Sequence, residues 1–245
     1  MNKKYNLFLI SVLLFVFLIS ISSSLFAEEF KMKQVEYLGQ SKLEIDTGGT
    51  KIIFEENSDE IYISEGLKFD KSTDYIYINS PKDHDSFDEW SNDKKEKIVI
   101  GSDLFTDIEI NTGGTSISGM INSDYLSIDG GGINITADII SNEVEINGGG
   151  INLESKIIAE YIELKGAGMK VDLEVEKSEE ISLDGAGISA NIKYLDVWNN
   201  KRNLAVNGVG GKVNIYVLKD ESKDYNGELD VSKSGIISIN VNYYQ

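Results

Sequence analysis

The chain has 245 residues, with 41 acidic and 23 basic side chains and a formal net charge of −18 at pH 7. This acidity disfavours nucleic acid and anionic lipid as partners. Cysteine is absent, which excludes a disulfide framework and lipid attachment through a cysteine.

Residues 1–27 have the order of a secretory signal, in which two lysines precede an apolar run at 7–21 and small residues end at Ala27. We expect cleavage after Ala27 or after Ser24. An uncleaved anchor is the alternative, because the apolar run approaches the roughly 20 residues that span a bilayer. Cleavage would remove two lysines and leave 21 basic against 41 acidic residues. The mature chain is expected to be extracytoplasmic (periplasm, cell surface or secreted), without membrane contact after cleavage.

Residues 28–100 are predicted to form irregular N-terminal coils of the same domain as the repeats that follow. Short runs rich in β-branched and aromatic residues predict strands at 61–63, 75–78 and 98–100. A charged loop at 79–97 contains the only histidine, His84, and Trp90. Long loops are often functional, but a solvated insertion is the simpler expectation here.

Residues 101–218 are predicted to be regular repeats. One phrase, two apolar residues separated by any residue and followed by a polar residue and small residues, occurs six times here and once upstream. The second apolar residue of each copy is Ile45, Ile110, Ile128, Ile146, Leu164, Leu183 and Val206. From Ile110 onward the anchors are 18, 18, 18, 19 and 23 residues apart, by their positions in the sequence. Steps of this regularity indicate stacked repeats.

Four residues after every anchor stands a glycine, and these are the candidate structural corner: Gly49, Gly114, Gly132, Gly150, Gly168, Gly187 and Gly210. Such uniformity suggests a positive φ angle or a close backbone approach at each corner. We therefore expect Gly150→Val to destabilise the fold. Gly149→Ala should be mild, because Ala167 and Ala186 occupy the equivalent position in later copies.

A second apolar column follows seven residues after the anchors: Ile52, Ile117, Ile135, Leu153, Val171, Ala190 and Val213. Two strands that meet at a corner, in coils stacked about 4.8 Å apart, would merge their apolar columns into one core. The sequence therefore predicts an all-β, single-stranded β-solenoid (β-helix) with coils of about 18 residues. A sandwich or barrel would give no reason for the constant step. The apolar spacings do not fall into sixes, which favours a right-handed coil over a left-handed one.

Residues 219–245 are predicted to form closing strands and a cap. Open ends of stacked coils recruit other chains unless they are covered. Tyr243 and Tyr244 are bulky enough to cover the last coil, so we expect a structural role for them.

The repeats Leu126-Ser-Ile-Asp-Gly-Gly-Gly-Ile-Asn-Ile and Val144-Glu-Ile-Asn-Gly-Gly-Gly-Ile-Asn-Leu resemble those of the bacterial putative-adhesin family of unknown function. That family is similar to the head GIN and toast-rack domains. The resemblance extends from Leu43 to about Ile215 and rests on the glycine corner. It implies an exported or membrane-tethered repeat domain, and the family has no established catalytic residues to transfer.

Catalytic chemistry is not indicated. A serine hydrolase would have to use His84, and no serine lies in a glycine elbow. Zinc is disfavoured because one histidine without cysteine cannot supply its usual ligands. The glycine run 130–132 mimics a phosphate loop but lacks the Lys-Ser/Thr that follows one. We therefore expect no enzyme activity, cofactor or metal.

One polar column follows directly after the anchors: Asp46, Asn111, Asp129, Asn147, Lys165, Asp184 and Asn207. In stacked coils these side chains would form a ladder, and a calcium ion between Asp129 and Asn147 is one interpretation. A hydrogen-bonded corner ladder is the other. Lys165 in the same column favours the ladder.

Between the buried pairs, an outward strip would contain Glu109, Ser127, Glu145, Glu163 and Ser182. Its carboxylates Glu109, Glu145 and Glu163 are the candidate binding residues. The sequence predicts a non-enzymatic exported module of the putative-adhesin type, which binds an unknown protein or glycan surface partner. The alternative is a structural or scaffolding β-helix that assembles end to end in the cell envelope.

Overall fold

The computed structural model describes residues 31–81, 96–219 and 227–245. The predicted signal at 1–27 lies outside the described residues, as does most of the predicted loop, including His84 and Trp90. Residues Met32–Gln245 form one compact unit. In the described part of the chain, no helix is long and apolar enough to cross a membrane.

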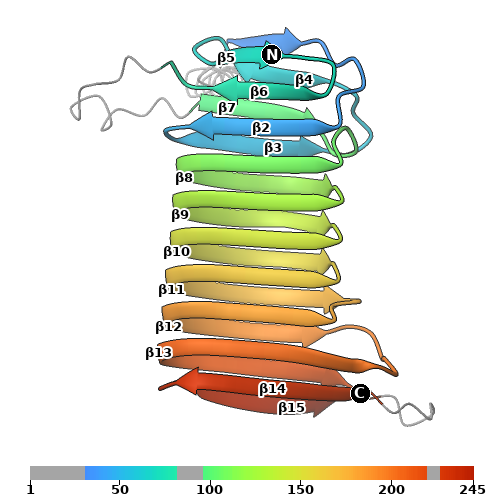
Figure 1. Ribbon diagram of the computed structural model, residues 1–245, viewed down its shortest axis with the longest axis vertical. Helices are drawn as coiled ribbons and strands as arrows, with labels where there is room; N and C mark the ends of the chain where they lie inside the picture. Colours follow the sequence, from blue (N-terminus) through green and yellow to red (C-terminus); the bar gives the residue numbers. More distant parts are fainter. Residues whose placement is uncertain (1–30, 82–95, 220–226) are drawn as a thin grey trace, which may run out of the picture. The chain divides into compact units, whose positions relative to one another are not determined.

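The unit is all-β (Figure 1). Its strands are β1 (Met32–Val35), β2 (Lys42–Thr47), β3 (Thr50–Glu55), β4 (Ile61–Ser64), β5 (Lys68–Lys71), β6 (Tyr75–Asn79), β7 (Glu96–Gly101), β8 (Asp107–Asn122), β9 (Tyr125–Ile140), β10 (Glu143–Ile158), β11 (Tyr161–Glu176), β12 (Glu180–Tyr194), β13 (Lys201–Leu218), β14 (Glu228–Gly235) and β15 (Ser238–Tyr244).

The six long strands β8 to β13 stack in parallel, and their register confirms the repeat. Ile110 pairs with Ile128, which pairs with Ile146, and the column continues to Val206. The second apolar column is also in register from Ile52 to Val213 and is buried throughout. The fold is a β-solenoid, as the sequence predicts. Its right-handed winding stays a prediction.

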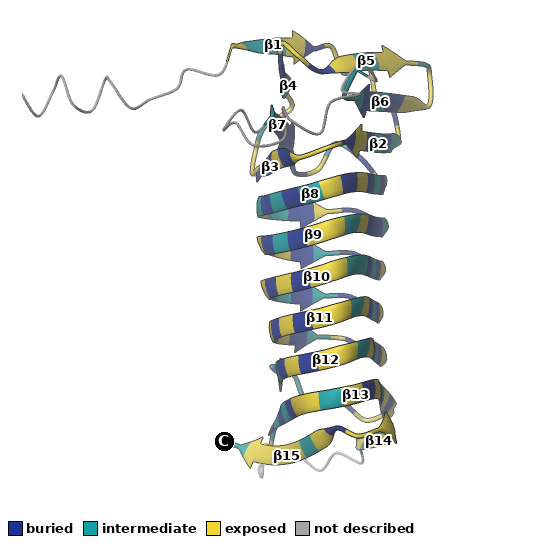
Figure 2. Ribbon diagram, turned by 90° about the vertical axis from the view of Figure 1, so that its left-hand side faces the viewer, coloured by how far each residue is buried: buried dark blue, intermediate teal, exposed yellow. Residues whose placement is uncertain are grey.

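Each long strand bends once, so that both of its halves face the core. In β10, Val144 and Ile146 are buried before the bend, and Ile151 and Leu153 after it. Successive side chains on a straight strand point to opposite sides, so even-numbered residues such as Ile146 and odd-numbered residues such as Ile151 would face opposite ways. They share one interior because the chain turns at 148–150. Figure 2 shows the resulting alternation of buried and exposed residues. We call the halves before the bend the first sheet and those after it the second sheet.

The two longer steps of the repeat are accommodated outside the strands. The 19-residue step adds one residue near Lys177, which adopts a positive φ of 63°. The 23-residue step adds a loop at 195–200. Arg202 is buried beside this loop, donates two hydrogen bonds to Asp196 at 2.8 and 2.6 Å, and lies 4.3 Å from the ring centre of Trp198. The loop is therefore fixed to the solenoid by an ion pair and a cation–π contact.

The N-terminal coils are not stacked in chain order. The β2–β3 coil pairs directly with β8, although 65 residues separate Ile45 from Ile110, and β6 and β7 pair with the other side of that coil. After β3 the chain thus forms β4 to β7 on the side of the β2–β3 coil that is away from β8. Residues 102–106 then lead back past that coil to β8. Phe105 is buried there and packs edge-on against Tyr37 at 5.4 Å between ring centres.

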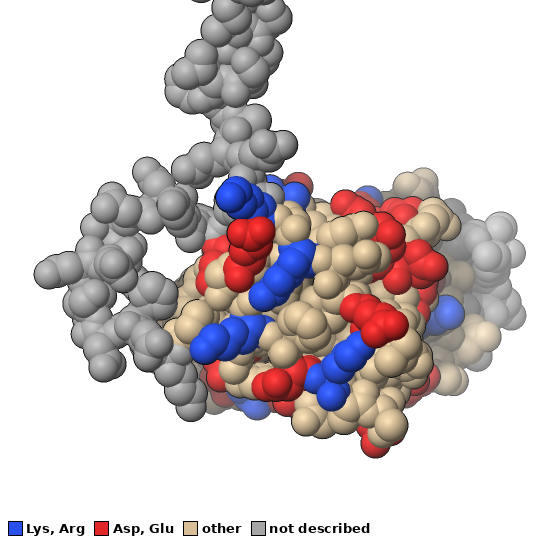
Figure 3. All heavy atoms as spheres, turned by 90° about the horizontal axis from the view of Figure 1, so that it is seen from above, with Lys and Arg blue, Asp and Glu red and all other residues tan. Residues whose placement is uncertain are grey.

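Antiparallel strands close this end of the solenoid. β5 pairs with β6, β4 pairs with β7, and β1 pairs with β4, all antiparallel. Figure 3 views this end and shows acidic and basic side chains interspersed over it. One ion pair there joins Lys71 to Glu36 at 2.7 Å.

At the other end, β14 and β15 both pair in parallel with β13. The expected covering of the last coil by Tyr243 and Tyr244 stays a prediction. Tyr243 pairs with the buried Val217 and is 69% exposed. The Tyr244 hydroxyl donates to the carbonyl of Tyr194 at 2.7 Å, which holds its ring against earlier coils.

The glycines four residues after the anchors stack in one column, but the reason expected for them is wrong. None of them has a positive φ, and a Cβ added to Gly132, Gly150 or Gly168 would meet nothing within 4 Å. The backbone-limited glycines lie elsewhere. The expectation that Gly149 tolerates a Cβ better than Gly150 is wrong, because a Cβ on Gly149 would lie 2.7 Å from the carbonyl oxygen of Gly131. Gly119 has a φ of +102°, and a Cβ on it would lie 1.8 Å from the carbonyl oxygen of Phe54.

Candidate binding face

The predicted acidic strip lies on the outer side of the first sheet. The parallel register places Glu109, Ser127, Glu145, Glu163 and Ser182 in one column, and Glu44 extends it by one coil. Because successive coils of a β-solenoid are about 4.8 Å apart, Glu145 and Glu163 are direct neighbours. The structure thus brings together the three candidate binding carboxylates along one line.

A second column runs beside this strip and was missed by the sequence reasoning. It stands three residues before each anchor and contains Asp107, Tyr125, Glu143, Tyr161 and Glu180. The same period that revealed the strip could have revealed this column, but its mixture of tyrosines and carboxylates hides the repeat. A shallow pocket of about 220 Å³ lies where the two columns meet. It is lined by Glu143, Val144, Glu145, Tyr161, Ile162, Glu163, Glu180 and Ser182.

We call the polar members of this lining the acidic patch: Glu143, Glu145, Tyr161, Glu163, Glu180 and Ser182. It contains four carboxylates from three successive coils. The Tyr161 side chain is 45% exposed and offers an aromatic surface among them. Such a surface suits a cationic group, which can contact both carboxylates and a tyrosine ring.

The carboxylates of the strip differ in their partners. Glu109 accepts a hydrogen bond from Lys42 at 2.9 Å, and Glu163 accepts one from Lys165 at 2.6 Å. Glu145 accepts a hydrogen bond from the Tyr125 hydroxyl at 3.1 Å. An exposed ion pair contributes only about 0–1 kcal/mol, so a partner's cation can compete with Lys165 at little cost. Glu145 is thus held in place by a neutral donor and not by a lysine.

The pKa shifts follow these contacts. The hydrogen bond to Glu109, followed by the one to Glu44, raises the pKa of Lys42. The hydrogen bond to Glu163 raises the pKa of Lys165. Lys42 and Lys165 are therefore charged at neutral pH. In the column beside the strip, burial raises the pKa of the Asp107 carboxyl, whose Oδ1 is enclosed without a hydrogen-bond partner among the described residues.

The corner column does not form the expected ladder. Asp46 accepts a hydrogen bond from Tyr77 at 3.2 Å, whereas Asn147 Oδ1 is enclosed without a partner among the described residues. In the described part of the chain, no three His, Cys, Asp or Glu residues are grouped to hold a metal ion. Amide ladders occur on the second sheet instead, where Asn214 donates to Asn191 at 2.9 Å and Asn240 donates to Asn214 at 3.2 Å.

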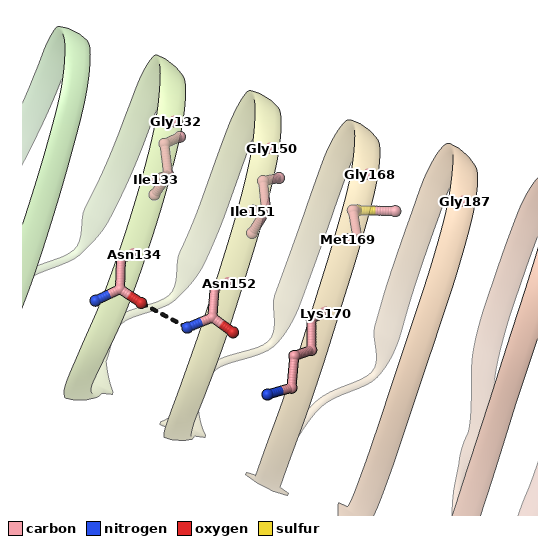
Figure 4. Close-up of a pocket in the computed structure, with 10 residues that line it drawn as sticks. All are labelled: Gly132, Ile133, Asn134, Gly150, Ile151, Asn152, Gly168, Met169, Lys170 and Gly187. Atoms are coloured by element: carbon pink, nitrogen blue, oxygen red, sulfur yellow. Dashed lines mark hydrogen bonds between the residues drawn. The ribbon is translucent and has the colours of Figure 1, made fainter.

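A second, more open hollow lies over the corner glycines (Figure 4). Gly132, Gly150 and Gly168 line it without side chains, and a column of polar residues borders it. In that column Asn152 donates to Asn134 at 2.5 Å. The hollow is shallow, and Lys170 is the ionisable side chain among its lining residues.

Comparisons with known proteins give one informative likeness. No family model and no curated protein matches the sequence. A solved structure of a putative adhesin from Bacteroides fragilis is similar with a TM-score of 0.57 and 16% identity, covering 88% of this chain and 98% of that one. A putative adhesin from Parabacteroides merdae (TM-score 0.37, 16% identity, 89% and 98% covered) and a putative cell adhesion protein from Clostridium sporogenes (0.23, 14%, 87% and 98%) are more distant.

At 16% identity, the likeness to the Bacteroides fragilis protein concerns the fold alone. It covers nearly the whole of that chain, so the shared architecture is the solenoid itself and not a fragment of it. The resemblance to putative adhesins that the glycine-corner repeats indicated is thereby confirmed in the architecture of the chain.

Proposed function

We propose that this protein is an exported, non-enzymatic β-solenoid of the adhesin type that binds a protein or glycan surface through its acidic patch. The observation that carries the proposal is the convergence of Glu143, Glu145, Glu163 and Glu180 around one pocket beside exposed Tyr161. Export is supported by the signal-like order of residues 1–27. The description of the Bacteroides fragilis structure as a putative adhesin supports the same class of function.

The chemistry of the patch defines the partner further. Four carboxylates in a protein of net charge −18 attract nearby cations and repel nucleic acid and anionic lipid. The preferred partner therefore presents lysine, arginine or amino-sugar groups. Exposed charges are screened within about 8 Å at physiological ionic strength, so binding is expected to be moderate and to weaken as salt rises.

The test is the double variant Glu145→Lys, Glu163→Lys, with binding of the secreted chain to intact cells or extracellular matrix as the readout. Two charge reversals at the centre of the patch should weaken binding roughly tenfold. The matched control is Glu154→Lys, Asp172→Lys, which makes the same charge change at two exposed, register-paired positions on the second sheet. Equal loss in both variants would show that net charge, and not the patch, is responsible. A folded patch variant that binds like the wild type refutes the proposal.

The alternative, a scaffold that assembles end to end, is less well supported. Head-to-tail filaments require two complementary open ends. The N-terminal end is covered by antiparallel strands with interspersed charges. Electron microscopy of the purified chain would reveal filaments directly.

A further inference from the structure

One outward column of the second sheet contains no carboxylate. It is the first outward column after the bend, and the register extends it through the strands that continue this sheet, from β7 to β15. Its members are Lys97, Lys51, Ser116, Asn134, Asn152, Lys170, Ser189, Lys212 and Ser238. We call it the lysine column. In a chain with 41 acidic and 23 basic residues, four lysines in line without an acid are a local reversal of charge.

The lysines of this column have no anionic partner among the described residues. None of the four forms an ion pair with another residue in the described ranges. On the same sheet, by contrast, Lys156 and Lys193 each pair with a glutamate, at 2.8 and 2.7 Å. Lys51 and Lys97 are register partners on neighbouring strands, where like charges destabilise a sheet. The column therefore offers positive charge that the described part of the chain does not neutralise.

The middle of the lysine column borders the open hollow over the corner glycines, which has a volume of about 580 Å³. Figure 4 shows Asn134, Asn152 and Lys170 on three successive coils at its edge. The Asn152 amide donates to Asn134 Oδ1, which orients both side chains and leaves the Asn134 amide and Asn152 Oδ1 without a hydrogen-bond partner among the described residues. An amide donor, a carbonyl acceptor and an ammonium group thus line one flat hollow. This combination suits a ring that has hydroxyls and a carboxylate.

We propose that the lysine column binds an acidic polysaccharide, whose chain lies along the column with its uronic-acid carboxylates at the lysines and its hydroxyls at the amides. The lysines are complementary in charge to the carboxylates, and the asparagines and serines provide donors and acceptors for sugar hydroxyls. Nucleic acid fits less well, because the column contains no aromatic side chain on which bases could stack. A flat anionic membrane would also meet the exposed carboxylates Glu154 and Asp172 in the adjoining column.

The negative net charge of the protein does not prevent this contact. The acidic patch lies on the first sheet, packed sheets are about 10 Å apart, and exposed charges are screened within about 8 Å at physiological ionic strength. The seven register steps from Lys97 to Lys212 extend about 34 Å at about 4.8 Å per step. A long chain can therefore contact several positions at once, and its affinity should rise with its length. Because the two faces differ, the inference does not depend on the proposed function.

Isothermal titration calorimetry of the purified chain with oligogalacturonides tests the proposal, and the same oligomers with their carboxylates methyl-esterified are the neutral probe. The chain should bind the acid form and bind the ester at least about fivefold more weakly. Lys170→Gln combined with Lys212→Gln should weaken binding of the acid form about fivefold. The control is Lys156→Gln with Lys193→Gln, the same change on the same sheet and likewise two coils apart, where each lysine has its own glutamate. Circular dichroism should show that both variants remain folded.

Several results would overturn the inference. The acid form could fail to bind, or the ester could bind as tightly, which would mean that the lysines do not hold carboxylates. Equal losses in the column variant and the control would make net charge responsible, and inorganic polyphosphate that binds as tightly as the oligogalacturonides would show that the column selects charge and not a sugar. Finally, the side-chain amide NMR signals of Asn134 and Asn152 should shift on binding, and unchanged signals would place the polysaccharide elsewhere.

Discussion

Gly119→Ala and Gly150→Ala form a matched pair that tests why the corner glycines recur. At Gly119, which pairs with Phe54 across the β3–β8 contact, φ is +102° and a Cβ would lie 1.8 Å from the Phe54 carbonyl oxygen. The chain must shift by more than 1 Å there. Backbone strain of about 1–3 kcal/mol and a weakened ladder hydrogen bond of about 0.5–1.5 kcal/mol oppose folding. The alanine also reduces the conformational freedom of the unfolded chain, which offsets about 0.4–1 kcal/mol of this loss in stability.

The net expectation for Gly119→Ala is a loss of about 0.5–4 kcal/mol in the free energy of unfolding, with a central value of about 2 kcal/mol. For Gly150→Ala, the φ angle is not positive and the added Cβ meets nothing within 4 Å, so only the unfolded-state effect remains and stability should be unchanged or rise by up to about 1 kcal/mol. Urea denaturation followed by circular dichroism measures both. Stacked repeats need not unfold in one step, so midpoints should be compared along with slopes. Equal losses in the two variants would refute the reasoning.

Two further predictions concern the loop contact and export. Burial acts to raise the pKa of Asp196, but the hydrogen bonds from Arg202 outweigh it, so its folded pKa is lowered. A lowered carboxyl pKa contributes stability above the unfolded pKa of about 3.9 that is lost as pH falls through the folded pKa. Asp196→Asn should therefore lower the urea midpoint at pH 7 and lower it by less at pH 3, and a gap of equal size at both pH values would contradict the ion pair. N-terminal sequencing of the exported chain should begin at Glu28 or Leu25, and a chain that keeps Met1 in the membrane fraction would contradict cleavage.

The regular part of the fold could be predicted from the sequence because its period is the coil length. Residues 18 apart, such as Ile128 and Ile146, become direct neighbours when coils stack in register. The same arithmetic aligned Glu145 with Glu163 and made the acidic strip predictable. Tyr161 and Glu180 obey that period too, but the chemistry of their column changes from coil to coil, and apolar patterning therefore did not reveal it.

The order of the N-terminal coils could not be predicted. Ile45 and Ile110 carry the same pattern, but the 65 residues between them show no regular step that would say which coils they contact. Their pairing depends on contacts such as that between Tyr37 and Phe105, which join residues far apart in the chain. Sequence patterns describe local periodicity, and such contacts arise only when the segments meet.

The sequence by itself determined the solenoid, its register and its acidic outer face, because in a stacked repeat the side-chain period is also the spatial neighbour relation. Only the tertiary structure decided which glycines the backbone needs, since that depends on the φ angle and on the distance to the adjoining coil, as at Gly119. It also decided the character of the two ends. Whether a core column is covered, as at Val217, or open, as at Val241, depends on the strand that lies beyond it.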